Sequence, residues 1–156
     1  MANPELTLER FYLKDLSFES PRSPQVFAQP WKPKVHVDLN SRTSTLEEDR
    51  YEVALTITVH TRNDEEETGY IVEVQYGGVF RIAGLEEAQL KRVLSTLCPN
   101  SLFPYIRETI DSVVVRGGFP ALCLAPINFD ALYDRAQQEN ADGPAMGQQD
   151  KPPVEH

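Results

Sequence analysis

The stretch Gly69–Leu85, GYIVEVQYGGVFRIAGL, predicts how the whole chain is organised. Its first half alternates strictly, with Ile71, Glu73 and Gln75 pointing one way and apolar or aromatic residues pointing the other. Because successive side chains of a strand leave opposite faces of the backbone, this alternation predicts a half-buried strand. After Gly84 the pattern becomes helical, so the stretch joins a sheet-forming half to a helix-forming half. The residues predicted to face the core are Tyr70, Val72, Val74 and Tyr76.

Three earlier segments also predict strands. Residues 6–19 form an extended segment whose alternation slips near Glu9. Lys34–Asn40 and Arg50–Thr61 each separate an apolar face from a polar face, which favours an antiparallel sheet covered on one side. We expect a hairpin loop over Ser41–Asp49 and a short acidic turn before the fourth strand. Four strands on short links predict a meander or a Greek-key sheet.

The second half of the chain predicts helices. A helical pattern begins at Leu85 and is interrupted by Cys98-Pro99-Asn100, because proline removes a backbone donor. The pattern resumes, with Asn100 or Ser101 as its cap, and stops at Arg116-Gly117-Gly118, whose glycines accept the left-handed geometry of a helix end. We therefore expect one long helix with an interruption.

An apolar crossover and a short helix complete the predicted domain. Phe119–Phe129 is apolar but contains two prolines, so we expect it to be extended, and Asn128 caps a helix that ends near Gln138. The fold class is α+β: a four-stranded antiparallel sheet, a long interrupted helix, an apolar crossover loop and a short C-terminal helix. We assign residues 1–138 to one domain and residues 139–156, rich in Gln, Pro, Gly and acids, to a disordered acidic tail.

Composition restricts the classes of function. The 156 residues are 40% hydrophobic and 25% charged, which suits one domain with a proper core. The net charge of −9 argues against a nucleic-acid partner, because phosphates require a basic surface. No apolar run is long enough to predict membrane insertion, and the first residues lack a secretory pattern. Cys98 and Cys123 both lie in apolar surroundings, so we expect a reduced cytoplasmic protein with buried thiols.

Motifs for catalysis are missing from the sequence. His36 and His60 lie on the polar faces of two predicted strands, with no carboxylate or cysteine at ligand spacing, so we predict no metal site. No phosphate-binding loop, G-x-S-x-G or H-E-x-x-H motif occurs. We expect neither an enzyme nor a cofactor. One alternative is a small ligand-binding enzyme of thioesterase-like fold, which would need an acid or histidine beside an apolar pocket.

Five strings follow one another between residues 8 and 135: FYLKDLSFESP, VFAQPWKPKVHVDLN, YEVALTITV, EVQYGGVFRIAG and LCPNSLFPYIRETIDSVVVRGGFPALCLAPINFDALY. In this order and spacing they resemble the SecB family of protein-export chaperones. The resemblance implies a homotetramer built as a dimer of dimers. It also implies an ATP-independent cytoplasmic protein that holds precursor proteins unfolded and delivers them to the SecA motor.

The resemblance also implies which residues bind these partners. The acidic residues of the family that dock SecA correspond here to Asp15, Glu19 and Glu73, with Ile71 where leucine is typical. Zinc belongs to the basic tail of SecA in such systems, and this chain offers no ligands for it. Tyr76 replaces a glutamine that is typical of the family.

Client binding requires a different surface, which must be long, apolar and tolerant of sequence. We expect a groove walled by the loop that holds the only tryptophan, by one strand, by the crossover and by the final helix. A SecB-like chaperone for a dedicated client, such as an antitoxin, is an alternative to general export. The groove residues expected are Trp31, Val35, Val37, Leu39, Phe119, Leu122, Leu124, Phe129 and Leu132.

Overall fold

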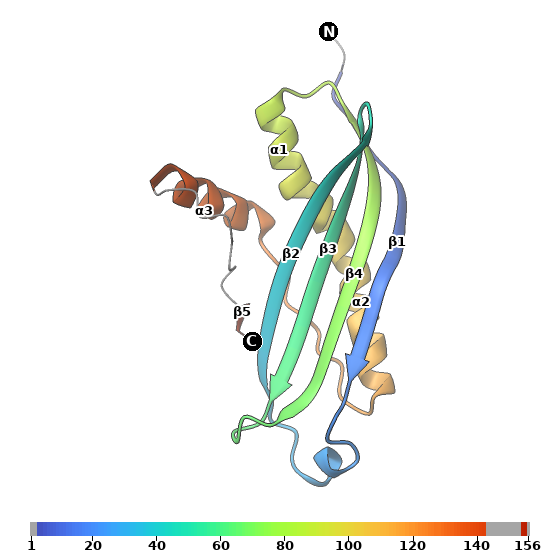
Figure 1. Ribbon diagram of the computed structural model, residues 1–156, viewed down its shortest axis with the longest axis vertical. Helices are drawn as coiled ribbons and strands as arrows, with labels where there is room; N and C mark the ends of the chain where they lie inside the picture. Colours follow the sequence, from blue (N-terminus) through green and yellow to red (C-terminus); the bar gives the residue numbers. More distant parts are fainter. Residues whose placement is uncertain (1–2, 143–153, 156) are drawn as a thin grey trace.

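The computed structural model describes residues 3–142 and 154–155. One antiparallel sheet is covered on a single face by helices (Figure 1). Its strands are β1 (Glu5–Glu19), β2 (Lys34–Glu47), β3 (Arg50–Arg62), β4 (Thr68–Ala83) and the two-residue β5 (Val154–Glu155). The strand order is β1-β4-β3-β2-β5. Because β2, β3 and β4 form consecutive hairpins and β1 returns beside β4, the four long strands make a Greek key.

Two single-residue bulges in β1 determine which of its residues face the core. The pairing between β1 and β4 shifts between Leu8 and Arg10 and again between Leu13 and Asp15. A bulge inserts one unpaired residue, here Glu9 and then Lys14, so the alternation restarts one position later. The irregularity predicted near Glu9 is confirmed, whereas the second was not foreseen. As a result, the apolar residues of β1 share the face that carries the core: Leu6, Leu8, Phe11, Leu13, Leu16 and Phe18.

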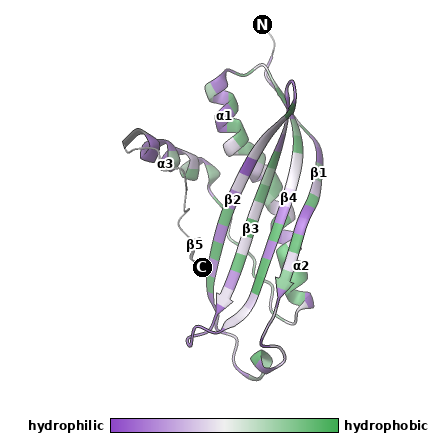
Figure 2. Ribbon diagram, viewed as in Figure 1, coloured by the Kyte–Doolittle hydropathy of each residue, from purple (hydrophilic) through white to green (hydrophobic). Residues whose placement is uncertain are grey.

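The helices lie on that same face of the sheet. Helix α1 (Glu87–Ser95) starts with a capping box in which the Glu86 amide donates to Gln89 Oε1 at 3.2 Å. Helix α2 (Leu97–Arg116) packs mainly on β4 and β3. Figure 2 shows hydrophobic and hydrophilic bands alternating along the strands, as expected for a sheet buried on one face only.

The interruption of the long helix lies at Thr96, two residues before the predicted Cys98-Pro99-Asn100. The prediction that Asn100 or Ser101 caps the second helix is wrong. The residue that flanks its N-terminus is Thr96. The position has a physical reason. In an unbroken helix the Pro99 ring would clash with the Ser95 carbonyl, whereas after a break at Thr96 the proline falls in the first turn, where no donor is needed.

Two other boundaries differ from the prediction. Strand β2 extends to Glu47, so the predicted loop over Ser41–Asp49 reduces to Glu48 and Asp49, the latter with φ of 63°. The extension carries exposed polar residues, so no apolar alternation marks it in the sequence. Helix α3 (Phe129–Asp142) continues four residues beyond the predicted end near Gln138. Most of the predicted tail, residues 143–153 and 156, lies outside the described residues.

The core lies between the sheet and helices α1 and α2. The predicted inward set of β4 is confirmed for Tyr70, Val72 and Val74, which are almost fully buried, while Tyr76 is partly exposed. Gly118, at φ of 93°, supplies the left-handed residue that ends α2. Residues 120–128 form an extended crossover without helix or strand, as predicted. The largest fully buried side chains are Tyr70, Phe80, Leu55, Ile57, Ile82, Leu102, Ile106 and Ile110.

Candidate functional site

Four residues predicted to dock a partner are brought together on the outer face of β1 and β4, the face that no helix covers. Glu19 pairs with Ile71, and Asp15 pairs with Gln75. Gln75 is the next residue after Glu73 on the same face of β4. Residues directly opposite in an antiparallel pair project from the same face. Asp15 and Glu19 are exposed, and Ile71 and Glu73 are partly exposed. We call Asp15, Glu19, Ile71 and Glu73 the acidic patch.

The bulge at Lys14 places Asp15 and Glu19 on this face. Before the bulge, Leu13 faces the core side opposite Tyr76, and unbroken alternation would turn Asp15 to that side as well. The extra residue moves Asp15 to the outer face and Leu16 to the inner one. The acidic patch therefore depends on a local irregularity of the strand.

Polar neighbours on β3 orient the patch. Thr58 Oγ1 donates to Glu73 Oε1 at 2.8 Å, and Gln75 Nε2 donates to Thr56 Oγ1 at 3.1 Å. The Thr58 hydroxyl carries no charge, so it orients Glu73 without neutralising the patch.

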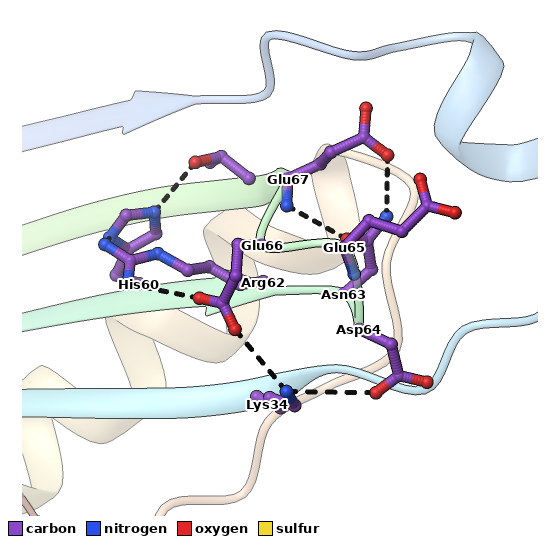
Figure 3. Close-up of polar contacts among 9 residues, drawn as sticks. Lys34, His60, Arg62, Asn63, Asp64, Glu65, Glu66 and Glu67 are labelled. Atoms are coloured by element: carbon purple, nitrogen blue, oxygen red, sulfur yellow. Dashed lines mark hydrogen bonds and ion pairs between the residues drawn. The ribbon is translucent and has the colours of Figure 1, made fainter.

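A histidine lies next to the patch and is followed by a charged turn; Figure 3 shows the histidine and the turn. His60 pairs with Ile71 across the β3–β4 ladder, and its Nε2 lies 2.8 Å from Thr68 Oγ1. Burial, together with the charges of Arg62 and His36, lowers the pKa of His60 below its ordinary value. Its ring therefore stays neutral at pH 7 and does not offset the acids. In the turn, Glu66 accepts from Lys34 at 3.4 Å.

The nine residues predicted to line a client groove divide into two sets. Five are core residues in this structure, with side chains no more than 9% exposed: Val37, Leu39, Phe119, Leu124 and Phe129. The other four pack against the core and remain partly exposed: Trp31, Val35, Leu122 and Leu132. Core packing is thus the main role of the first set, although Leu39 and Phe129 also line the groove described below, and the second set is partly available at the surface.

An aromatic cluster joins the first loop to the crossover. The Trp31 ring lies 4.8 Å from Phe119 and 5.8 Å from Tyr70, measured between ring centroids. Offset or tilted aromatic pairs at such distances stabilise beyond the area they bury. Trp31 and Phe119, which the sequence assigned to one groove, are therefore in contact.

Asp111 of α2 fixes the crossover. Its Oδ1 accepts from the amides of Leu122 and Cys123 at 2.9 and 3.0 Å. Cys123 has φ of 54°, an uncommon conformation for a residue other than glycine. Two charge-assisted bonds to adjacent amides hold this conformation in place. The sequence offered no signal for Asp111, because an acid on a helix is usually solvated.

A groove of about 260 Å³ runs between β2 and α3. Predicted residues Leu39, Phe129 and Leu132 form its apolar part. Sequence reasoning missed the polar part, because the β2 residues there were assigned to a loop and the α3 residues to the end of a helix or a tail. The polar lining residues are Ser41 and Thr43 of β2, Gln137 and Asn140 of α3, and Ser95 at the end of α1.

Comparison with known proteins identifies the family. The profile described as "Preprotein translocase subunit SecB" matches residues 1–140. The chain belongs to the SecB family. It is 54% identical over 142 residues to the protein-export protein SecB of Pseudomonas fluorescens, covering 88% of this chain and 89% of that one. It is 49% identical over 152 residues to that of Pseudomonas aeruginosa, covering 97% and 91%. The predicted relationship to SecB, and with it a chaperone that serves protein export, is confirmed.

A solved structure shares the fold. The SecB-like chaperone of Mycobacterium tuberculosis, in complex with a peptide from the HigA1 antitoxin, matches with a TM-score of 0.67 and 16% identity. The match covers 79% of this chain and 91% of that one. The predicted SecB-like α+β fold is confirmed, with a four-stranded antiparallel sheet, a long helix and a short final helix.

The SecB family is a family of chaperones, which gives no support to the thioesterase-like alternative. Within residues 3–142 and 154–155, no group of three or more histidine, cysteine or acidic residues could hold a metal ion. No helix in the described part of the chain is long and apolar enough to cross a membrane. The prediction of two buried thiols is half wrong. Burial raises the pKa of Cys98 to about 12, whereas Cys123 is exposed because the crossover passes over the surface.

Proposed function

We propose that this SecB family member works in the cytoplasm as an ATP-independent holdase that binds unfolded precursor proteins and delivers them to the SecA motor. The observation that carries the proposal is the placement of two different surfaces on opposite sides of one sheet. The acidic patch lies on the uncovered face, and the groove beside β2 opens on the face that the helices cover. A client and a motor could therefore occupy the protein together.

The groove suits an extended, apolar segment of polypeptide. Leu39, Phe129 and Leu132 offer apolar contact, and the hydroxyl and amide groups beside them can bond to a peptide backbone. Burying about 800 Å² of apolar area contributes roughly 20 kcal/mol before costs. Ordering a flexible client offsets most of that gain. Several grooves on one assembly would then supply affinity through multivalency.

The acidic patch suits a basic partner, as expected for the tail of SecA. The net charge of −9 steers a cationic chain toward the protein, and the exposed carboxylates orient it. Ile71, partly exposed beside Glu19 and Glu73, adds an apolar contact at one end of the patch. Protein interfaces commonly combine apolar contacts with a polar rim.

We propose that the working form is a homotetramer, a dimer of dimers. Strand β1 lies at one end of the sheet order, so its outer backbone groups have no partner strand in the described part of the chain. Four of its apolar residues are at least 40% exposed: Leu6, Phe11, Leu13 and Leu16. The Phe11 ring stacks on Tyr105 of α2 at 4.1 Å, which extends the apolar surface onto the helix. A continuous exposed apolar surface marks an interaction site.

General export is the better supported client range. Relatives that are about half identical carry the name protein-export protein SecB. The SecB-like chaperone that was solved with an antitoxin peptide is only 16% identical to this chain. A dedicated client such as an antitoxin is therefore the second candidate, and it predicts one tight client in place of many weaker ones.

The decisive experiment mixes the purified protein with a denatured precursor without ATP and follows aggregation by light scattering. We expect suppression at stoichiometric tetramer, followed by capture of the client complex on immobilised SecA. Failure to suppress aggregation would refute the holdase, and suppression without SecA capture would refute the delivery step. A panel of unrelated precursors separates the two client ranges.

A further inference from the structure

Arg92 of α1 joins α1 to α3 across 38 and 42 residues of sequence. Its Nη1 donates to Asp134 Oδ1 at 2.8 Å and its Nη2 donates to Asp130 Oδ1 at 3.2 Å. The guanidinium carbon also lies 5.3 Å from the centroid of the Tyr133 ring, within the range of a cation–π contact. One side chain therefore contacts three residues of α3.

The two faces of α3 have different roles. Phe129, Leu132 and Ala136 recur at helical spacing and line the groove beside β2. Asp130 and Asp134, four residues apart, face Arg92 instead. Tyr133 belongs to both faces, because it lines the groove and also lies below the guanidinium. Turning or lifting α3 would therefore open the groove and break the Arg92 contacts together.

Few other contacts hold α3 against the domain. Phe129 is the only residue of positions 129–140 that is fully buried, and Leu132 is partly buried. Beyond Asp134, most side chains up to Asn140 are exposed. Figure 1 shows the helix standing away from the sheet, with its far end directed outward. The helix is thus fixed by apolar packing of Phe129 at its start and by the Arg92 contacts with Asp130 and Asp134 over its first two turns.

We propose that Arg92 is the positioning residue of the client groove: its contacts with Asp130, Tyr133 and Asp134 hold α3 as the outer wall facing β2. The inference rests on the proposed holdase function, since the occupant is an extended, unfolded polypeptide segment. On this proposal the shape of the groove depends on the exposed ion pairs of Arg92 with Asp130 and Asp134. These pairs are screened by salt, so affinity for an uncharged client falls as ionic strength rises, although the client itself carries no charge.

The test compares Arg92→Gln with Lys91→Gln, which removes the same charge from the next residue of α1. Lys91 lies 4.0 Å from Glu87 of its own helix, so it serves as the matched control. The first readout is the rate of amide hydrogen exchange in α3, measured by mass spectrometry. A peptide from α2 serves as the internal reference. We expect α3 to exchange about two- to fivefold faster in Arg92→Gln, the range for exposed ion pairs, with α2 unchanged.

The second readout is the dissociation constant for a labelled, uncharged and permanently unfolded polypeptide. We expect Arg92→Gln to weaken binding by about two- to fivefold and to abolish its dependence on salt. The urea midpoint of global unfolding should stay unchanged. Arg92→Lys keeps the charge but not the forked geometry, so it should restore part of the loss.

A charge exchange completes the design. Arg92→Asp combined with Asp134→Arg should recover both the slow exchange and the affinity that either single variant loses. Asp134 is chosen because Asp130 lies in the first turn of α3, where an acid also stabilises the helix end. Unchanged α3 exchange in Arg92→Gln would overturn the proposal. Faster exchange with unaltered client binding would overturn it too, since the wall would then not matter to the client. A wild-type protein that binds no client would instead refute the proposed function, while the exchange data would still decide the role of Arg92 in fixing α3.

Discussion

Glu19 lies directly opposite Ile71 in the ladder between β1 and β4, on the face of the sheet that no helix covers. The pairing places a carboxylate beside a partly exposed aliphatic side chain, and Glu73 follows Ile71 by two residues along β4. We expect Asp15→Lys with Glu73→Lys to weaken SecA binding by about tenfold, because two attractive contacts become repulsive. Surface plasmon resonance on immobilised SecA measures the change.

The matched control for these reversals is Glu5→Lys with Glu48→Lys. Both acids are exposed and lie at the other end of the sheet, so the net charge changes equally. Suppression of client aggregation should be preserved in both double variants. Equal loss of SecA binding in the control would show that net charge, rather than the acidic patch, governs docking.

Asp111 should determine the path of the crossover. Replacing it by alanine leaves the Leu122 and Cys123 amides without their acceptor, and we expect unfolding free energy to fall by about 1–3 kcal/mol. Asp111→Asn retains an oxygen at the same place and should recover most of the loss. Urea denaturation followed by circular dichroism measures both variants. Equal destabilisation by asparagine and alanine would mean that the charge, not the pair of hydrogen bonds, is what matters.

Glu52 should contribute stability that depends on pH. The hydroxyl of Tyr12 and the ammonium of Lys14 donate to its carboxylate, and these bonds hold the pKa of Glu52 below its ordinary value of 4.5. A lowered folded pKa stabilises the protein above the unfolded value, and the contribution disappears as pH falls through the folded one. We expect Glu52→Gln to cost about 1 kcal/mol at pH 7. The difference should shrink as pH falls below 4.5 and vanish once pH has passed below the lowered folded pKa.

Urea titrations of wild type and Glu52→Gln at several pH values measure this difference. Glu87→Gln is the control, because Glu87 lies 4.0 Å from Lys91 in an exposed pair. Its effect should stay below about 0.5 kcal/mol at every pH. A difference between wild type and Glu52→Gln that persists unchanged into acid would contradict the titration argument.

The exposed apolar residues of β1 should govern assembly. We expect native mass spectrometry to give a tetramer for the wild type and smaller species for Leu13→Glu, because a buried unpaired charge is strongly unfavourable. Leu46→Glu is the control, since Leu46 is also exposed but lies near the end of β2. A monomeric wild type would refute the assembly proposal.

Removing residues 143–156 takes only the two-residue strand β5 from the sheet, so the domain should stay folded, with an unfolding free energy within about 0.5 kcal/mol of the full chain. A second truncation after Gln138 also removes the last residues of α3, so comparing the two isolates the stability of that helix end. Differential scanning calorimetry provides the comparison. Marked unfolding of the longer product would contradict the assignment of a separate tail.

Much of this fold follows from residue periodicity, and the misses have local causes. Strict alternation in β4 predicted Tyr70, Val72 and Val74 as core. The alternation of apolar and polar residues slips visibly at Glu9, where the first bulge lies. The second bulge, at Lys14, was not predicted, because the spacing of Leu13, Leu16 and Phe18 was taken only as part of an irregular strand. The helix break was predicted at Pro99 but lies at Thr96, because a proline clashes with the carbonyl four residues earlier and so ends the helix before its own position.

The site was predicted less completely than the fold. Family resemblance supplied the acidic patch, and the structure explains its geometry through the Lys14 bulge. Composition could not separate Val37 and Leu39, which are core, from Val35, which is partly exposed, because all three are apolar residues on one strand face. Asp111 and Arg92 act on residues distant in sequence, so no local pattern could reveal them.

The two cysteines differ in exposure, so their alkylation rates differ in the folded protein. Cys98 is buried and keeps its proton, while Cys123 lies exposed on the crossover, one residue from the partly exposed Leu122. Since only thiolates react, a maleimide at neutral pH modifies Cys123 alone in the folded chain. If a client covers the crossover, as predicted for Leu122, the alkylation rate of the unaltered protein should fall while the client is bound.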